Sequence, residues 1–330
     1  MKNLFGLLMV LLLSSSLAQN SNVTVGEPYT VTDGLGREMT LEAPPERVAA
    51  LANGPYGHMA SLGVVPSAVL ANPEMINDTE TYLEEGPDIF WVGGDPWWEV
   101  DAELVAVHAP DLIITIRQQH VDLLSGIAPV FVVPGVSEEA TGEPLAYSEL
   151  RAVGAALGRP EDADTVIENF EQLIEAYAAM VPEQPTTLKM MQSANGGFAF
   201  SAVADPLCAH LLDRIVTCEW PQPPGVTDWD YPGTLEVALA LDPDVIVLAN
   251  NSSTQSHDEF LAMLDADPLW NEVAAVKNDR VLFFPDYRNP IFSSVASGRK
   301  FLDTVMPAMF PGVFPEPLTD EQVQEILANQ

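Results

Sequence analysis

The sequence predicts an α/β protein built from two Rossmann-like lobes with parallel sheets, which a single long helix joins. Continuous apolar runs such as RVAAL (47–51) and PVFVV (129–133) are typical of strands that a parallel sheet buries on both faces. A helical period of apolar residues covers 161–180. One phrase also occurs twice, as ELVAVHAPDLIITI at 103–116 and as EVALALDPDVIVLA at 236–249. A repeated unit of this kind indicates two related lobes.

The first half of the chain begins with two short strands around the turn Asp33-Gly34-Leu35-Gly36. After the strand at 47–51, the segment ANGPYGH (52–58) is expected to be a loop that leads into a short helix ending near Gly63. Further strands are predicted at 67–71, 88–93, 110–116 and 129–133, with a helix around 119–127 between the last two.

The second half opens with helices. One is predicted over 146–158 and a longer one over 161–180, where Val166, Phe170, Leu173 and Tyr177 fall on a single helix face. Strands follow at 188–193, 198–202, 245–250 and 280–284. We therefore divide the chain into a signal peptide (1–18), an N-terminal α/β lobe (19–150), an interlobe helical segment (151–183) and a C-terminal α/β lobe (184–330).

Each copy of the repeated phrase predicts a helix that runs directly into a strand. The helices begin near Glu103 and Glu236. They end at Pro110 and Pro243, because proline interrupts the backbone hydrogen bonds of a helix. The two glutamates therefore occupy matching positions in two similar lobes.

The N-terminus carries an export signal. Residues 1–18 are typical of a secretory signal peptide, since a lysine precedes the apolar run LFGLLMVLLL and small residues lead up to Ala18. No cysteine follows that cleavage site directly, so we expect a periplasmic protein without a lipid anchor. Cys208 and Cys218, the two cysteines of the chain, are expected to form a disulfide in that oxidising compartment.

The charge balance excludes two classes of partner. The chain has 48 Asp and Glu against 13 Lys and Arg, a net charge of −35. Such a surface repels nucleic acid and anionic lipid. The acidity has two interpretations, which are steering of a cationic ligand and solubility in a salty medium, where charges are screened beyond about 10 Å.

Five segments, in this order, carry a resemblance to a known family: VTDGLGREMTLEAPPERVAAL (31–51), ELVAVHAPDLII (103–114), LSGIAPVFVV (124–133), LRAVGAALGRPEDAD (150–164) and DPLWNEVAAVKNDRVLFF (267–284). They resemble the class III periplasmic substrate-binding proteins of ABC importers, which capture ferric siderophores, haem or cobalamin. The resemblance implies two lobes around a ligand cleft, one rigid interlobe helix and delivery of the ligand to a membrane permease. It implies neither an enzyme nor a resident cofactor.

The resemblance also implies a role for the two matched glutamates. In that family one glutamate on each lobe pairs with arginines of a dimeric permease, and Glu103 and Glu236 lie at the matching positions. Both are therefore expected to dock on an ABC permease, whose ATPase supplies the free energy for transport. An ordinary glutamate at a helix start, favoured by the helix dipole, is the alternative. The receptor itself is expected to act as a monomer.

Candidate ligand-binding residues follow from a rule that does not depend on the resemblance: ligands of open parallel sheets bind beyond the carboxyl ends of the strands. The loops at those ends are rich in aromatic side chains, which suit a bulky chelate, and contain two arginines, which suit its anionic oxygens. The candidates are Tyr56, His58, Trp97, Trp98, Arg117, Phe198, Phe200, Trp229, Asn250, Tyr287 and Arg288. Packing in the core or at the rim is the alternative for each of them.

The same loops rank the possible ligands. Arg117 and Arg288 are too few for a highly anionic triscatecholate, so a neutral hydroxamate-type or a carboxylate-type ferric siderophore is expected first. Cobalamin comes second and haem third. Binding of free Zn²⁺ or Mn²⁺ by His58, His120 and Asp286 is a rival interpretation, although no dedicated metal site is predicted.

One short motif points to an enzyme. The tetrad from Ser297 to Lys300 matches the Ser-x-x-Lys of penicillin-interacting enzymes. Its companion motifs, Ser-Asp-Asn and Lys-Thr-Gly, are absent from the sequence. We therefore expect no catalytic activity and interpret this stretch as the start of a helix.

Overall fold

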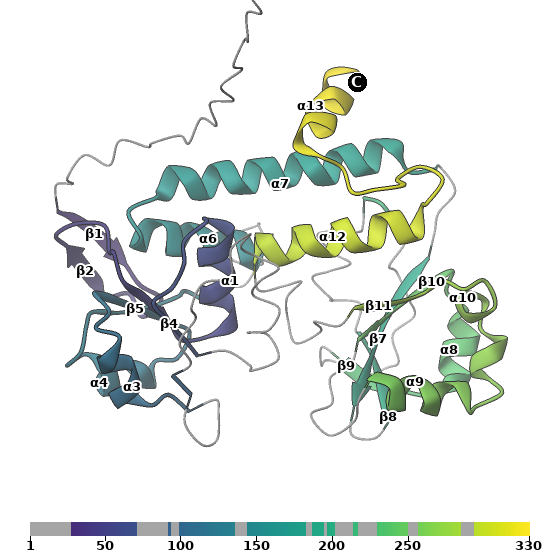
Figure 1. Cartoon of the computed structure of the whole chain (residues 1–330), viewed down its shortest axis with the longest axis horizontal. Helices are drawn as coiled ribbons and strands as arrows, with labels where there is room; N and C mark the ends of the chain where they lie inside the picture. Colours follow the sequence, from purple (N-terminus) through teal and green to yellow (C-terminus); the bar gives the residue numbers. More distant parts are fainter. Residues whose placement is uncertain are drawn as a thin grey trace, which may run out of the picture.

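The computed structural model describes residues 28–70, 92–93, 99–135, 144–182, 187–194, 197–201, 214–216, 230–249, 257–284 and 294–330. Figure 1 shows two α/β lobes below a pair of long helices that lie side by side, α7 (Pro160–Met180) and α12 (Val295–Met309). The two-lobe α/β fold predicted from the sequence is confirmed. Among the described residues, no helix combines the length and the apolar character needed to cross a membrane.

The N-terminal lobe contains a parallel sheet of strand order β4-β3-β5-β6. Its strands are β3 (Val48–Ala50), β4 (Ala68–Val69), β5 (Leu112–Thr115) and β6 (Val130–Val132), and its helices are α1 (Asn53–Ser61), α3 (Ala102–Val107), α4 (Gln119–Leu124) and α6 (Leu145–Ala156). The antiparallel hairpin of β1 (Tyr29–Thr32) and β2 (Glu38–Leu41) precedes the sheet. Its turn is attached to β6, because the Gly34 amide donates to the Val132 carbonyl at 2.7 Å.

Helices cover both faces of this sheet, as the apolar strands predict. Successive side chains of a strand point to opposite faces. Val48 and Ala50 of β3 pack in the cluster that includes α1, α6 and α7, whereas Ala49 packs in the cluster that includes α3 and α4. Therefore α1 and α6 lie between the sheet and α7, and α3 with α4 form the outer layer of the lobe (Figure 1).

The C-terminal lobe has a five-stranded sheet of order β11-β10-β7-β8-β9. Its strands are β7 (Leu188–Ala194), β8 (Gly197–Ser201), β9 (Asp230–Gly233), β10 (Val245–Ala249) and β11 (Val281–Phe284). Its helices are α8 (Leu235–Leu241), α9 (His257–Asp265), the 3₁₀ turn η3 (Trp270–Glu272) and α10 (Ala274–Lys277). These helices bury one face of the sheet, through Met191, Ile246 and Leu248, and the opposite face places Val245 and Val247 in the cluster that includes α7 and α12.

The prediction of a parallel sheet is wrong for part of the C-terminal lobe. β11, β10 and β7 are parallel, but β8 is antiparallel to both β7 and β9. Only Asn195 and Gly196 separate β7 from β8. Since a connection of two residues can join antiparallel neighbours only, the pairing follows from the length of this connection.

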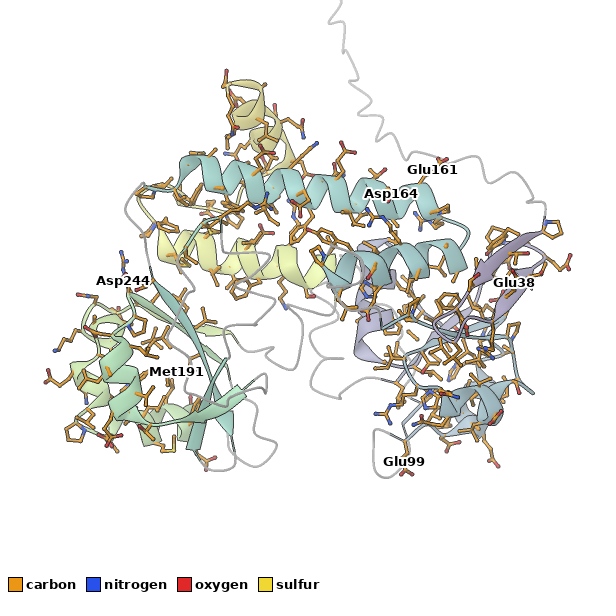
Figure 2. The ribbon with its side chains drawn as sticks, turned by 180° about the vertical axis from the view of Figure 1, so that it is seen from behind. Glu38, Glu99, Glu161, Asp164, Met191 and Asp244 are labelled. Atoms are coloured by element: carbon orange, nitrogen blue, oxygen red, sulfur yellow. The ribbon has the colours of Figure 1, made fainter. Side chains whose placement is uncertain are left out.

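The predicted interlobe helix is confirmed as α7. Its buried face includes Phe170, Leu173 and Tyr177, with Val166 partly buried against the same cluster. Pro160 stands at the start of the helix, where its missing amide costs no hydrogen bond. The opposite side of α7 is exposed and acidic, and Figure 2 labels Glu161 and Asp164 on it.

The chain crosses between the lobes a second time, which the sequence division did not anticipate. β11 ends in the C-terminal lobe, and α12 then begins beside α1, where the Ala296 amide donates to Ser61 Oγ at 3.0 Å. α12 packs on α1, α6 and α7, and α13 (Asp320–Ala328) packs on α7. Residues assigned to the C-terminal lobe therefore supply part of the helical layer that spans both lobes (Figure 1).

Candidate functional site

The carboxyl end of β5 presents Arg117 in a defined turn. The Arg117 amide donates to Thr115 Oγ1 at 3.1 Å, and the same hydroxyl lies 2.8 Å from His120 Nδ1. Burial first, and then the positive charge of Arg117, lower the pKa of His120, so its imidazole is neutral at neutral pH. The Arg117 side chain is half-buried and lies at the carboxyl edge of the sheet, where the sequence analysis predicts the ligand.

Tyr56 and His58 do not occupy the loop that the sequence predicts. α1 already begins at Asn53, and both side chains are buried within the lobe, with exposed fractions of 1% and 0%. His58 Nε2 lies 3.0 Å from Glu149 Oε2 on α6, while His58 Nδ1 is buried without a hydrogen-bond partner. The expectation of exposed rings at these two positions is corrected, because a helix in place of the loop turns them into the core.

Glu103 lies at the second position of α3. The carboxylate of Asp101, the residue before the helix, accepts hydrogen bonds from the amides of Glu103 and Leu104 at 2.9 and 3.2 Å. This cap satisfies amides that have no partner within the helix. The Glu103 side chain is left exposed.

Glu236 lies at the second position of α8. Thr234 precedes this helix, and its hydroxyl accepts from the Val237 amide at 3.4 Å. Hydrogen bonds from the Glu236 amide first, and from Thr234 second, lower the pKa of the Glu236 carboxyl. The side chain is exposed and ionised at neutral pH.

The units around these two glutamates have the same geometry. After each helix, one residue adopts a left-handed backbone: Ala109 with φ of 43° and Asp242 with φ of 44°. A Pro-Asp pair follows, and the aspartate carboxylate binds the start of the neighbouring strand. Asp111 accepts from the amides of residues 46 and 47 at 2.8 and 2.9 Å, and Asp244 accepts from the amide and hydroxyl of Thr187 at 2.9 and 2.8 Å.

This geometry places both glutamates on equivalent surfaces. In each lobe the helix ends next to the amino end of the following strand, so its first turn lies toward the carboxyl edge of the sheet. Figure 2 shows Asp244 at the end of the C-terminal lobe nearest to α7 and α12. The first turn that carries Glu236 therefore points away from that helical layer, and Figure 2 labels Glu99, which precedes α3, at the end of the N-terminal lobe far from α7.

The remaining candidates are only partly placed. Phe198 and Phe200 lie in β8, where they pair with Ser193 and Met191 of β7. Outside the described residues lie Trp97, Trp98, Trp229, Asn250, Asp286, Tyr287 and Arg288, together with Cys208 and Cys218. The structure therefore brings the two glutamates into equivalent positions.

The described residues of the rival metal and enzyme interpretations have other hydrogen-bond partners in the structure. His58 lies on α1 and His120 on α4, which cover opposite faces of the sheet, and each imidazole has its own protein partner. Over the described ranges, no group of three His, Cys, Asp or Glu side chains could hold a metal ion. Ser297 is buried and donates to the Ser294 carbonyl at 2.9 Å, as expected for a residue in the first turn of α12.

The sequence analysis does not predict two of the side-chain roles that the structure shows. Glu149 is the partner of His58 across 91 positions, and no local pattern signals that pairing. The strand-binding role of Asp111 and Asp244 did have a signal, since the Pro-Asp pair is part of the repeated phrase.

Comparison with known proteins identifies the family. Residues 48–287 match the sequence profile of the family described as periplasmic binding protein. The chain belongs to this family. The resemblance to class III periplasmic substrate-binding proteins of ABC importers is thereby confirmed, and the described structure agrees with it in both lobes.

Three similar proteins have low sequence identity to this chain. A Bacillus subtilis protein named as an ABC transporter substrate-binding lipoprotein, YhfQ, is 23% identical over 85% of this chain and 90% of its own length. The iron-uptake substrate-binding protein PiuA of Streptococcus pneumoniae shares the fold with a TM-score of 0.65, at 17% identity, over 86% of this chain and 100% of that one. FeuA of Bacillus subtilis, solved with ferri-bacillibactin, gives a TM-score of 0.61 at 16% identity, over 86% and 98%.

Proposed function

We propose that this periplasmic binding protein captures an iron–siderophore complex between its two lobes and delivers it to an ABC permease dimer. The observation that carries the proposal is the equivalent placement of Glu103 and Glu236, each exposed at the second position of a capped helix. A partner that contacts both would present the same surface twice. A permease made of two identical subunits has that property.

The physical role of the two glutamates is orientation. An exposed ion pair contributes only about 0 to 1 kcal/mol. Two such pairs in matched positions nevertheless select one docking orientation and raise the association rate. The strongly acidic chain, with a net charge of −35, would reinforce the attraction to arginines on the permease.

The docking proposal is tested with charge reversal. The double variant Glu103→Arg, Glu236→Arg should abolish ligand uptake by cells that carry the cognate permease and ATPase, with the ligand dissociation constant unchanged. A matched control is Glu168→Arg, Glu325→Arg, which makes the same charge change at exposed positions of α7 and α13. Weaker ligand binding in the first double variant, or equal loss of uptake in the control, would reject docking through these residues.

The proposed ligand class rests on Arg117. Arg117 provides a half-buried cation at the carboxyl edge of the N-terminal sheet, where it could contact anionic oxygens of a chelate. The proposed order is a hydroxamate-type or carboxylate-type ferric siderophore, then cobalamin, then haem. FeuA was solved with a triscatecholate complex, so a ferric catecholate belongs among the ligands to be compared.

Tryptophan fluorescence identifies the ligand class. The mature protein is titrated with a ferric hydroxamate, a ferric catecholate, cobalamin, haemin and Zn²⁺. Saturable sub-micromolar quenching by a ferric hydroxamate, weakened in Arg117→Ala, supports the proposal. Quenching by Zn²⁺ alone would favour a metal receptor, and a response only to cobalamin or haemin would reassign the ligand.

We also propose that the mature protein is a monomer released into the periplasm, with Cys208 and Cys218 joined by a disulfide. The support is the signal-like N-terminus without a following cysteine, although the similar YhfQ is named as a lipoprotein. Mass spectrometry of the purified mature protein tests the release and the disulfide, and size-exclusion chromatography tests the monomer. An N-terminus at Gln19 and a mass two hydrogen atoms below the reduced value are expected, whereas an added diacylglyceryl group would contradict release.

A further inference from the structure

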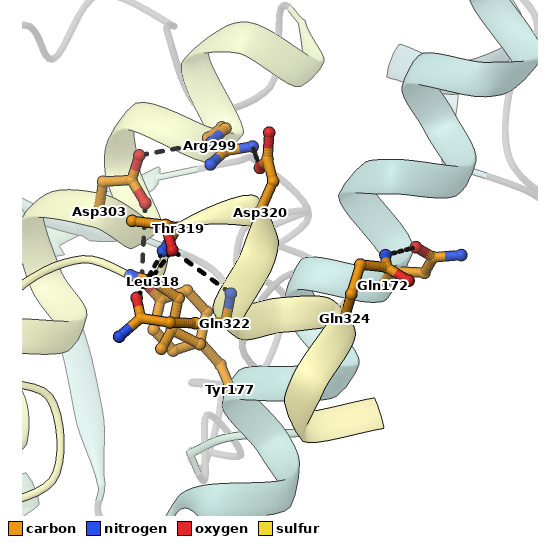
Figure 3. Close-up of polar contacts among 9 residues, drawn as sticks. All are labelled: Gln172, Tyr177, Arg299, Asp303, Leu318, Thr319, Asp320, Gln322 and Gln324. Carbon is orange, nitrogen blue, oxygen red and sulfur yellow. Dashed lines mark hydrogen bonds and ion pairs between the residues drawn. The ribbon is translucent and has the colours of Figure 1, made fainter. Parts of the chain in front are cut away.

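Three elements meet at Tyr177, near the end of α7 (Figure 3). The first is α7 itself, the second is α12, and the third is the C-terminal segment, defined as residues 310–330. The Tyr177 side chain is completely buried. Its hydroxyl oxygen forms hydrogen bonds with both of the other elements.

The hydroxyl of Tyr177 both accepts and donates. It accepts from the Leu318 amide of the C-terminal segment at 3.1 Å, and it donates to Asp303 Oδ1 of α12 at 3.5 Å. Burial raises the pKa of this phenol to about 12, so the proton remains available to Asp303 throughout the physiological range. The ring itself packs edge-on against Phe314 at 5.0 Å between centroids.

An ion-pair chain extends this contact to α13. Arg299 lies 3.6 Å from Asp303 on α12, and its Nη1 lies 2.8 Å from Asp320 Oδ1 at the start of α13. Thr319 and Gln322 cap α13 reciprocally, which fixes where this helix begins. Consequently the start of α13 is held against α12.

The other end of α12 is fixed to the N-terminal lobe. Ser61 of α1 accepts from the Ala296 amide, and the absence of a side chain at Gly298 allows Phe170 of α7 to pack against the helix backbone. α12 is therefore attached at its first turn to the N-terminal lobe and, near Asp303, to the far end of α7, and both helices share a buried cluster with Val245 and Val247 of the C-terminal lobe. It forms a second strut beside the interlobe helix (Figure 1).

We propose that Tyr177 is a positioning residue whose hydroxyl fastens α12 and the C-terminal segment onto α7 and thereby sets the spacing of the two lobes. A binding protein with this arrangement keeps its ligand residues at a constant separation. That consequence rests on the proposed function, but the lobe spacing itself can be measured on the protein without ligand or permease.

The test uses Tyr177→Phe, which retains the ring and its packing on Phe314 and removes the oxygen alone. Hydrogen exchange should become roughly tenfold faster or more around Leu318, whose amide loses its acceptor. The same variant should accelerate exchange in the first turn of α12, at residues 295–298, and leave β5 and β10 unchanged. Small-angle X-ray scattering should show a larger radius of gyration.

Gln324→Ala is the matched control. It removes the contact between Gln324 and Gln172 of α7, at 2.7 Å, and does not touch the Tyr177 hydroxyl. Its effect should remain within α13, with an unchanged radius of gyration. The proposal is overturned if Tyr177→Phe changes exchange only in residues 318–328, changes it uniformly in every peptide, or leaves the radius of gyration unchanged.

The partner of the hydroxyl provides a second variant. Asp303→Asn retains an oxygen that can accept from Tyr177 but removes the charge facing Arg299. It should preserve the exchange at residues 295–298, whereas Asp303→Ala should reproduce the effect of Tyr177→Phe. If both Asp303 variants accelerate exchange at residues 295–298 equally, the effect belongs to the ion pair with Arg299, and a role for the hydroxyl is contradicted. Failure of ligand binding in the unmodified protein would leave all these measurements unaffected.

Discussion

Asp111 and Asp244 perform the same structural task in the two lobes. Each follows a proline after a helix that carries one of the matched glutamates, and each carboxylate binds the residues directly before the first parallel strand of its lobe. The repeated sequence phrase therefore specifies a three-part unit of helix, Pro-Asp junction and strand. The orientation of each glutamate relative to its sheet depends on that junction.

Substitution of Asp244 should loosen the junction of the C-terminal lobe. Asp244→Ala removes the acceptor for the amide and hydroxyl of Thr187, and we expect the free energy of unfolding to fall by about 1 kcal/mol because the site is exposed. Urea denaturation measures the change. Asp244→Asn keeps one side-chain oxygen and should lose less, and an equal loss in both variants would contradict the assignment to the accepted hydrogen bonds.

Gly298 should not tolerate a side chain. A Cβ atom at this position would lie 2.7 Å from Cζ of Phe170, so Gly298→Ala must displace α12 from α7 or move the ring. Overpacking of this kind costs about 1 to 3 kcal/mol. The control is Gly126→Ala, where a Cβ would meet no atom within 4 Å. Thermal unfolding of both variants checks the prediction, which fails if Gly298→Ala is as stable as the control.

Asp33 should make the stability of the hairpin pH-dependent. Burial alone would raise the pKa of its carboxyl, but hydrogen bonds from Arg37 and from the Leu35 amide outweigh burial and lower the pKa. A carboxyl whose pKa is lower in the folded state stabilises the fold. This stabilisation is complete above the unfolded-state pKa of about 4, and it is lost as the pH falls through the folded-state pKa.

The corresponding variant is Asp33→Asn. At neutral pH we expect it to lower the free energy of unfolding by about 1 to 2 kcal/mol, since the buried amide cannot form the same charged contact with Arg37. The difference from the unmodified protein should shrink as the pH falls below about 4. Denaturant unfolding across this range measures the difference, and parallel pH profiles of the two proteins would contradict the role of Asp33.

Some expectations failed for identifiable local reasons. The segment around Gly54 and Pro55 looks like a loop, yet α1 includes both residues, because proline is tolerated in the first turn of a helix, where its missing amide has no partner. As a result Tyr56 and His58 face the interior. The strand predicted at 198–202 is present as β8, but it runs antiparallel to β7, because Asn195-Gly196 is a pair typical of short hairpins and hydrophobicity alone does not distinguish the two directions.

The two α/β lobes, the helix α7 with its buried face, and the equivalent placement of Glu103 and Glu236 could all be predicted from the sequence. Each of them follows from the periodicity of one short segment, or from the comparison of two such segments that repeat one phrase. The contacts of Tyr177 with Asp303 and Leu318, across 126 and 141 positions, could not be predicted in this way. They depend on how whole helices pack, because a buried hydroxyl forms hydrogen bonds with the partners that the packing brings within reach.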